Sequence, residues 1–434
     1  MTADGADPTG EGQGDAARGG LVARVRRWVP PHATGRRLLV AALVDSTGTG
    51  LYLATSALFL TRTIGLSPVE VGIGVSAGGV GGLLGTVPVG RLADRVGARP
   101  VLVALYLLRG VCFAALPFLH GPVGFVALSF VIGVAEWSGG PLVQSLVGAT
   151  DDGADRVTTM AAVFSVRNIG FTVGALLAGI AVTAGDTGTF TVLVLLDAAS
   201  FVVTAALLTR LDVPPAGARA GAPPLPRGAW RRAWNPRLLA LTGLNGVLYL
   251  HTILLGVVLP LWITTRTAAP PAMIAVLVVV NTVIAVVLQV PLSRGLDSAP
   301  AAAHRQLRAG LSLAGCCLLA AAAAWTGALA AAVLIVAVAV VLSLGEIWQG
   351  AGAWRLSFAL APPAERSYYL GIYELGISAA SAVGPALLTW AVLDDGGGTL
   401  GWVVLAAVFA VTGPAVVAVT RGLPTHLEDQ EATT

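Results

Sequence analysis

The chain has 434 residues, of which 56% are hydrophobic and only 11% carry a charged side chain. About a quarter of the residues in soluble domains are charged, so this composition excludes a soluble globular enzyme and predicts an integral membrane protein. The net charge of +3 rests on 26 basic residues, all of them arginine. These arginines are distributed as membrane-topology signals, which excludes nucleic-acid binding and leaves the lipid bilayer as their partner.

Twelve apolar runs follow one another along the chain, most of them close to the roughly 20 residues that cross a hydrocarbon core of about 30 Å. In chain order they cover residues 38–60, 69–89, 101–119, 123–149, 157–184, 190–208, 238–263, 272–292, 309–325, 329–354, 368–393 and 400–420. Backbone amides in lipid must be paired within the segment or in a closed barrel, and these runs are too long for barrel strands. The sequence therefore predicts an all-α integral membrane protein with twelve transmembrane helices.

A proline- and arginine-rich segment, residues 210–237, separates the first six runs from the last six. We expect a cytoplasmic linker there, between a six-helix bundle at residues 38–209 and a second one at residues 238–420. Residues 1–37 are expected to form a disordered cytoplasmic tail without a cleavable signal peptide, and residues 421–434 a second cytoplasmic tail.

The orientation in the membrane follows from the arginines, because basic residues in short loops stay on the cytoplasmic side. With the N-terminus inside, Arg109 and Arg167 lie within helices and only Arg62 and Arg266 face outward. We therefore predict a multi-pass protein of the cell's inner membrane with both termini in the cytoplasm.

An internal repeat relates the two bundles. The segment from Glu136 to Arg156 aligns without a gap with the segment from Glu346 to Arg366, at an offset of 210 residues. A weaker match sets Asp45 of the first run against Asn245 of the seventh. Two parallel, pseudo-symmetric six-helix halves around a central cavity are the architecture of one class of transporter.

A charged loop, GRLADRVGARP at residues 90–100, lies between the second and third runs. Its residues Gly90, Asp94, Arg95, Gly97 and Arg99 resemble the signature loop of the major facilitator superfamily, and the resemblance extends over the twelve-helix chain. The matching loop of the second half keeps only Gly295 and Asp297.

In that superfamily the loop's aspartate acts as a cytoplasmic latch. We expect Asp94 to accept hydrogen bonds from free backbone N–H groups at the start of the eleventh helix, near Ser367. Glu374, close to the same helix start, is a candidate gate residue or helix-dipole partner. The alternative is that these charges only fix the topology.

Two further segments resemble the macrolide and multidrug efflux type within the superfamily: Arg167-Asn168-Ile169-Gly170 and Asp197-Ala198-Ala199-Ser200-Phe201. This resemblance implies an exporter driven by protons. Counting along the helices places Arg167 and Asp197 at similar depth, so they are a candidate buried ion pair. Arg109 has Asp45 or Glu136 as candidate partners, and all of these pairs would also suit a purely structural role.

The other polar candidates fall on the first, fourth, seventh and tenth helices, which line the central cavity in the superfamily: Asp45, Glu136, Asn245, His251 and Glu346. A carboxylate in a partly dry cavity can bind and release a proton, which a proton-coupled exporter needs. Our hypothesis is that Glu136 and Asp45 alternate between a proton and the substrate, with Glu346 contributing from the second half. Cavity walls are expected to include Tyr52, Trp137, Trp348 and Gln349.

These residues suit large amphipathic or cationic small molecules, although they would also be ordinary as packing aromatics. Uptake of a metabolite remains open, because Arg109 and Arg355 offer fixed positive charge. A membrane-embedded enzyme or a non-transporting sensor is disfavoured, since the sequence carries no catalytic constellation and no nucleotide loop. Cys112, Cys316 and Cys317 lie within helices, and neither a metal site nor a cofactor is indicated. We expect a functional monomer, with sodium coupling also open.

Overall fold

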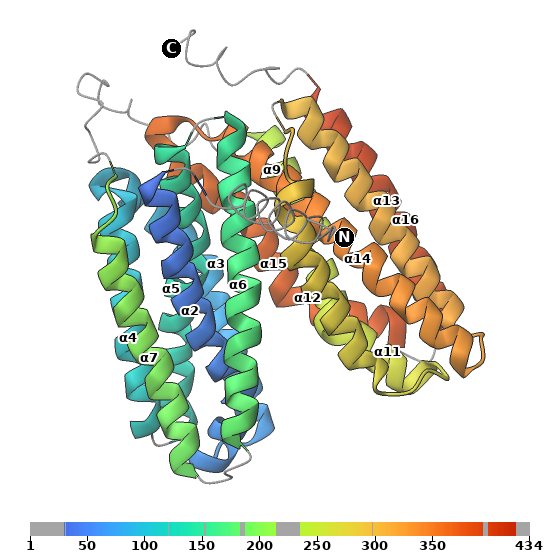
Figure 1. Cartoon of the computed structure of the whole chain (residues 1–434), viewed down its shortest axis with the longest axis horizontal. Coiled ribbons are helices and arrows are strands. Elements are labelled where there is room, and N and C mark those ends of the chain that lie inside the picture. Colours follow the sequence, from blue (N-terminus) through green and yellow to red (C-terminus); the bar gives the residue numbers. More distant parts are fainter. Residues whose placement is uncertain are drawn as a thin grey trace, which may run out of the picture.

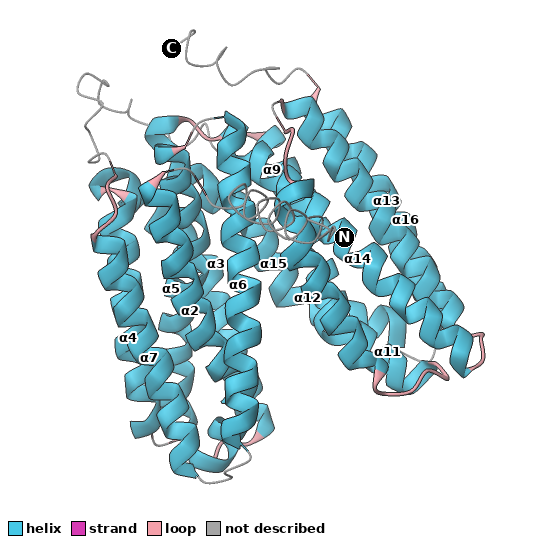
Figure 2. Ribbon diagram, in the orientation of Figure 1, coloured by secondary structure: helices cyan, strands magenta, loops and turns pink. Residues whose placement is uncertain are grey.

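The structure is a computed structural model that describes residues 30, 32–119, 121–151, 153–182, 187–213, 235–296, 298–393 and 398–421. Within these ranges it is helical, without strands, and twelve helices are long and apolar enough to cross a membrane (Figure 2). Most of the proposed tails and linker, at residues 1–29, 214–234 and 422–434, lie outside the described residues, as does Asp297.

The first half consists of six spanning helices. They are α2 (Ala33–Leu58), α3 (Pro68–Val96), α4 (Ala98–Ala115), α5 (Pro122–Thr150), α6 (Gly153–Val182) and α7 (Thr187–Thr209). A π-helical turn at Phe59–Thr63 extends α2, and Ser67 caps α3 through a reciprocal pair of hydrogen bonds with Glu70.

The second half has the same number of spans, the first of which is interrupted. The seventh span is built from α9 (Pro236–Tyr249), α10 (His251–Ile253), a π-helical turn at Leu254–Val258 and α11 (Leu259–Arg266). The remaining spans are α12 (Met273–Leu292), α13 (Ala299–Ala323), α14 (Ala328–Leu360), α15 (Arg366–Leu393) and α16 (Gly398–Thr420).

One predicted boundary is wrong by ten residues. The ninth span was expected from residue 309, whereas α13 begins at Ala299, where the Ser298 side chain accepts a hydrogen bond from the Ala301 backbone N–H. The first turns of α13 carry His304, Arg305 and Gln306, which a search for continuous apolar sequence passes over. An N-cap followed by proline starts the helix earlier than hydropathy indicates.

The two halves meet at one end of the molecule and diverge toward the other (Figure 1). At the end where they meet, α15 packs against α3 and α5, and α12 packs against α6. We call this the closed end; it contains the end of α3, the end of α5 and the start of α15. The opposite end, which contains the starts of α5 and α14, is called the open end.

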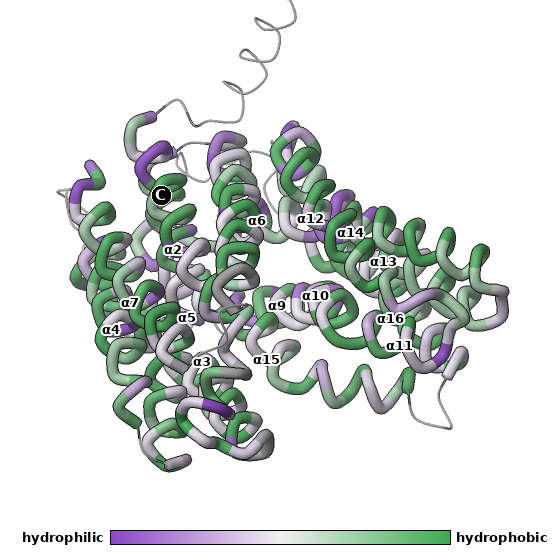
Figure 3. The backbone as a smooth tube through the Cα atoms, turned by 60° about the horizontal axis from the view of Figure 1, so that its bottom comes forward, coloured by the Kyte–Doolittle hydropathy of each residue, from purple (hydrophilic) through white to green (hydrophobic). Residues whose placement is uncertain are grey.

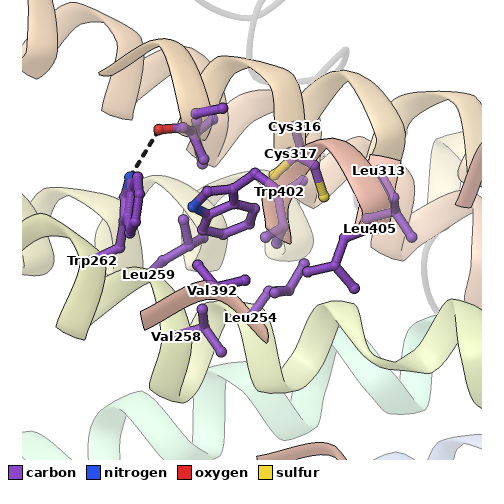
Figure 4. Packing of buried hydrophobic residues seen from close by; sticks show 14 of the residues in the cluster. Leu254, Val258, Leu259, Trp262, Leu313, Cys316, Cys317, Val392, Trp402 and Leu405 are labelled. Atoms are coloured by element: carbon purple, nitrogen blue, oxygen red, sulfur yellow. Dashed lines mark hydrogen bonds between the residues drawn. The ribbon is translucent and has the colours of Figure 1, made fainter. Parts of the chain in front are cut away.

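Hydrophobic residues run along the helices of both halves, and hydrophilic ones gather mainly near the helix ends (Figure 3). Inside the second half, Trp262 and Trp402 are almost fully buried and meet edge to face at 5.6 Å between ring centroids. Trp262 Nε1 donates a 2.8 Å hydrogen bond to the Ala320 carbonyl oxygen, which satisfies its polar edge (Figure 4). This cluster ties α11, α13 and α16 together.

Small residues set how closely the helices pack. A Cβ atom added to Gly133 of α5 would lie 1.9 Å from the Gly78 carbonyl oxygen of α3. On the other side of the molecule, a Cβ added to Gly376 of α15 would lie 1.9 Å from the Thr242 carbonyl oxygen of α9. Membrane helices associate through such close backbone contacts, because lipid provides no hydrophobic force to drive them together.

We expect Gly133→Ala to lower the melting temperature of the purified protein, because a backbone oxygen cannot move aside cheaply. Overpacking of this kind costs about 1–3 kcal/mol. The matched control is Gly139→Ala in the same helix, where an added Cβ meets nothing within 4 Å. Equal melting temperatures for the two variants would contradict this account of the α3–α5 contact.

Candidate functional site

A buried carboxylate joins three helices in the middle of the first half. Asp45 of α2 is 0% exposed. Its Oδ2 atom accepts a 3.0 Å hydrogen bond from Arg167 of α6, and its Oδ1 atom lies 3.5 Å from Arg109 of α4. One negative charge therefore holds two arginines within a bundle where an unpaired charge would be costly.

Arg109 is also held by aromatic rings. Its guanidinium carbon lies 4.1 Å from the centroid of the Phe201 ring on α7 and 5.6 Å from that of Tyr106. Its Nε atom is buried and has no hydrogen-bond partner. Of the two partners that the sequence left open for Arg109, Asp45 makes the ion pair.

The expected ion pair between Arg167 and Asp197 is wrong. Both α6 and α7 pack against α2 but make few contacts with each other, so equal depth in the membrane does not bring these two side chains together. Asp197 instead accepts a 3.3 Å hydrogen bond from Ser200 at Oδ1, and its Oδ2 atom is buried without a partner. Depth along a helix can be counted from sequence, whereas the neighbour that a side chain faces cannot.

Glu136 of α5 is exposed, unlike the aspartates of this cluster. It interacts electrostatically with Arg109, Tyr52 and Asp197, which places it beside the buried charges. Among the described residues, no salt bridge to Glu136 is found. The neighbouring Trp137 lies over Gly82 of α3, whose added Cβ would come 2.3 Å from the indole ring, so this ring also packs the α3–α5 contact.

The second half carries neutral amides where the first half carries charges. Glu346 of α14 is partly buried and accepts a 2.7 Å hydrogen bond from Asn281 of α12. One turn further along α14, Gln349 donates a 2.7 Å hydrogen bond to Asn245 of α9, and its backbone oxygen accepts one from Gln306 of α13. Asn281 and Gln306 were missed from the sequence; for Asn281, a lone amide in an apolar run was the available signal.

The other expected cavity residues are distributed around these two groups. His251 is buried, and its Nδ1 atom lies 2.8 Å from the Leu248 carbonyl oxygen at the break between α9 and α10. Trp348 is partly buried with no partner for its Nε1 atom, and Tyr52 stacks edge to face on Phe113 at 4.8 Å. The candidate residues therefore form a charged cluster in one half and an amide cluster in the other, and His251 interacts electrostatically with Glu346 of the second group.

At the closed end, Asp94 makes the hydrogen bonds expected from the sequence. Its two carboxylate oxygens accept 2.9 Å hydrogen bonds from the backbone N–H groups of Ser367 and Tyr368, in the first turn of α15. An anion at a helix N-terminus satisfies free donors and interacts favourably with the helix dipole.

Only some of the other residues of the segment 90–100 contribute to this contact. Gly90 lies against Ser367, since an added Cβ would come 2.6 Å from the Ser367 carbonyl oxygen, and Gly97 has a positive φ of 103° that favours glycine. Arg99 donates to the Leu211 carbonyl oxygen at 2.6 Å, and Arg95 is exposed. Arg91, which sequence reasoning did not select, donates a 2.9 Å hydrogen bond to the Tyr368 hydroxyl.

Further contacts cross between the halves at the closed end. Gln144 of α5 donates a 2.7 Å hydrogen bond to Ser357 of α14, and the hydroxyls of Ser145 and Ser367 lie 2.9 Å apart. Glu374 lies two turns along α15 from the start of the helix and is partly buried.

Two arginines related by the internal repeat also meet the opposite half here. Arg366 donates a hydrogen bond to the Gly148 carbonyl oxygen. Its repeat mate Arg156 lies 5.9 Å from the ring of Phe358, the residue that corresponds to Gly148 at the same 210-residue offset.

The profile of the Major Facilitator Superfamily matches residues 38–354. The chain belongs to this superfamily. It is accordingly a multi-pass membrane transporter rather than an enzyme, and no group of three or more metal-ligating side chains occurs among its described residues.

Solved structures share the fold at low sequence identity. The human organic anion transporter MFSD10 superposes with a TM-score of 0.68 at 17% identity, covering 89% of this chain and 100% of that one. The fucose:proton symporter of E. coli gives a TM-score of 0.71 at 11% identity, covering 89% and 98%. A bacterial homologue of the iron transporter ferroportin, in an outward-facing state, gives 0.68 at 17% identity, covering 89% and 98%.

One curated relative matches a short part of the chain. It is a protein of Agrobacterium vitis named "Putative tartrate transporter", 31% identical over 99 residues. The matched stretch is 23% of this chain and 22% of that protein.

We expect Asp45→Asn to destabilise the protein strongly, because it leaves Arg109 and Arg167 without their shared counter-ion. Breaking a buried ion pair costs about 3–5 kcal/mol. The measurement is the melting temperature in detergent or nanodiscs. Glu136→Gln, at an exposed carboxylate of the same cluster, is the control and should melt close to the parent; an equally stable Asp45→Asn would show that the ion pairs contribute little.

Asp94→Asn should loosen the closed end, since hydrogen bonds to a charged group are each worth about 1.5–3 kcal/mol. The reporter is Ser145→Cys, placed in a background where Cys112, Cys316 and Cys317 are replaced by alanine. Alkylation of this cysteine should accelerate by about tenfold or more, given that each 1.4 kcal/mol is a tenfold change.

The control for Asp94→Asn is Glu70→Gln, which changes a carboxylate that caps the other end of the same helix. This variant should leave the alkylation rate of Ser145→Cys unchanged. If Asp94→Asn also leaves the rate unchanged, its hydrogen bonds to α15 do not hold the closed end together.

Proposed function

We propose that this chain is a proton-coupled exporter of amphipathic small molecules that works by alternating access. The observation that carries the proposal is the exposed carboxylate of Glu136 beside the ion pairs of the fully buried Asp45, in a molecule whose halves meet at one end and diverge at the other. Intramembrane carboxylates are expensive to keep and are therefore functional candidates by default.

The closed end is, in this proposal, the cytoplasmic end. This end carries most of the described arginines, including Arg91 and Arg95 at the end of α3 and Arg99 at the start of α4, and basic residues at helix ends and in short loops remain on the cytoplasmic side. Both termini then lie in the cytoplasm, and the protein resides in the inner membrane. The state described here opens outward, with Asp94 acting as a latch that holds the inside shut.

Coupling follows from competition for one site. A proton or a positively polarised substrate group can neutralise the carboxylate of Glu136, but both cannot do so at once. A proton arriving from outside therefore displaces substrate, and substrate arriving from inside displaces the proton. Asp45 shares this coupling role through the two arginines with which it pairs. Each transport cycle is then a shift in population between the inward-open and outward-open states.

The substrate class follows from the candidate cavity residues of both halves. Trp137 and Trp348 offer flat apolar surfaces, and the amides of Asn245 and Gln349 both donate and accept hydrogen bonds. Together with the charge of Glu136, this set suits amphipathic molecules that are neutral or cationic. Glu346 is the corresponding acidic group on the second half.

A second function is favoured by one observation. The side chain of Arg167 is 38% exposed although it lies within a spanning helix, so its guanidinium is accessible to an anion. Uptake of a small carboxylate would use this charge, in line with the name of the relative from Agrobacterium vitis.

One experiment separates the two functions. The chain is expressed in an efflux-deficient bacterium and challenged with a panel of amphipathic antibiotics and dyes, with and without a proton uncoupler. Under the export proposal, resistance appears, disappears with the uncoupler, and is lost in Glu136→Gln but kept in Glu70→Gln. Absence of any resistance from well-expressed protein, together with uptake of radiolabelled tartrate, would replace export by import.

A further inference from the structure

A buried acid in the first half has no assigned task. Asp197 of α7 is 0% exposed, and its Oδ2 atom has no hydrogen-bond partner. An ionised carboxylate in that position would bear an uncompensated charge in a dry environment, which is among the most costly arrangements in a protein. A proton on Oδ2 removes this charge and its cost.

Arg109, which has a buried N–H group without a hydrogen-bond partner, lies near Asp197. The guanidinium of Arg109 rests 4.1 Å from the ring of Phe201, one helical turn along α7 from Asp197, and its Nε atom makes no hydrogen bond. Its contact with Asp45 is long, at 3.5 Å. Arg109 is therefore only partly satisfied by the partner it has.

Glycines bring the three helices close enough for an exchange. A Cβ added to Gly110, next to Arg109, would lie 3.3 Å from the Ala198 carbonyl oxygen of α7. A Cβ added to Gly48 of α2 would lie 2.6 Å from Asp197 Oδ1. Gly48 is one turn, about 5 Å, from Asp45 along α2, so Asp197 meets α2 close to the carboxylate that pairs with Arg109.

We propose that Asp197 holds a proton in the state described here and, on releasing it, takes Arg109 from Asp45 in the opposite state. This inference rests on the proton coupling of the proposed function and names a second residue that performs it. Asp45 keeps Arg167 throughout, at 3.0 Å. Each buried carboxylate then has one arginine in the second state.

The groups facing Asp197 come from every neighbouring helix. They are Asp45 and Tyr52 from α2, Arg109 from α4 and Glu136 from α5, together with Ser200 of its own helix. Release breaks the O–H bond of Asp197 and leaves its carboxylate with the electron pair. The proton passes to water on the side to which the transporter is then open, and Arg109 neutralises the charge that remains.

Infrared spectroscopy tests this directly and requires no substrate. A protonated carboxylic acid has its own carbonyl stretching band. The difference spectrum, wild type minus Asp197→Asn, should contain that band at neutral pH. Ser200→Ala, which removes only a neutral partner of Asp197, and Glu136→Gln should both retain it. Asp197→Glu, offered in case the asparagine variant is misfolded, should shift the band rather than remove it.

Spin-label distances test the exchange. Val123 and Leu329 start α5 and α14 at the open end and are 82% and 81% exposed. Cysteines there, with the three native cysteines replaced, should report a distance that shortens as pH rises in the wild type. Asp197→Asn should hold the long distance at every pH, because the amide mimics the protonated acid.

Two results would overturn the inference. The first is a carboxylic acid band that neither disappears in Asp197→Asn nor shifts in Asp197→Glu. The second is a spin-label distance that responds to pH in Asp197→Asn as it does in the wild type. Failure of the export proposal has a different signature, since resistance can be absent while the band and the pH response are both present.

Discussion

The fold of the first half depends on the carboxylate of Asp45. It is fully buried, and it compensates two arginines that the membrane would otherwise exclude. Because the partners come from α2, α4 and α6, the ion pairs fix the relative rotation of three helices as well as their depth. Apolar packing alone leaves such rotations loosely specified, since one leucine surface resembles another in lipid.

The two halves share an architecture but differ in their polar content. The first half concentrates charge around Asp45, whereas the corresponding place in the second half holds Asn245, hydrogen-bonded to Gln349. Amides tolerate an apolar environment at lower cost than charges and can both donate and accept. In our proposal the two halves therefore have different roles: the first half couples transport to protons through its charges, and the second half forms hydrogen bonds with the substrate.

Sequence reasoning recovered the features that depend on chain composition and local spacing. The twelve spans, the two halves and the hydrogen bonds from Asp94 to the start of α15 follow from hydropathy, the repeat and helix-end chemistry. Sequence reasoning paired Arg167 with Asp197 wrongly and overlooked Asn281, because the choice of partner depends on helix rotation and on which helices are neighbours. The early start of α13 was missed for a different reason, since polar residues in its first turns conceal a helix from a hydropathy search.

The repeat-related contacts at the closed end have a consequence for the chain's history. Arg366 meets Gly148 while Arg156 lies near Phe358, so the same pair of positions is used twice, once in each direction. That is the pattern of an isologous dimer interface, now enclosed within a single polypeptide. In an ancestral pair of identical six-helix subunits, one mutation would have altered both contacts together. Within a single chain the two contacts can differ, and here Arg366 donates a hydrogen bond where Arg156 lies near an aromatic ring.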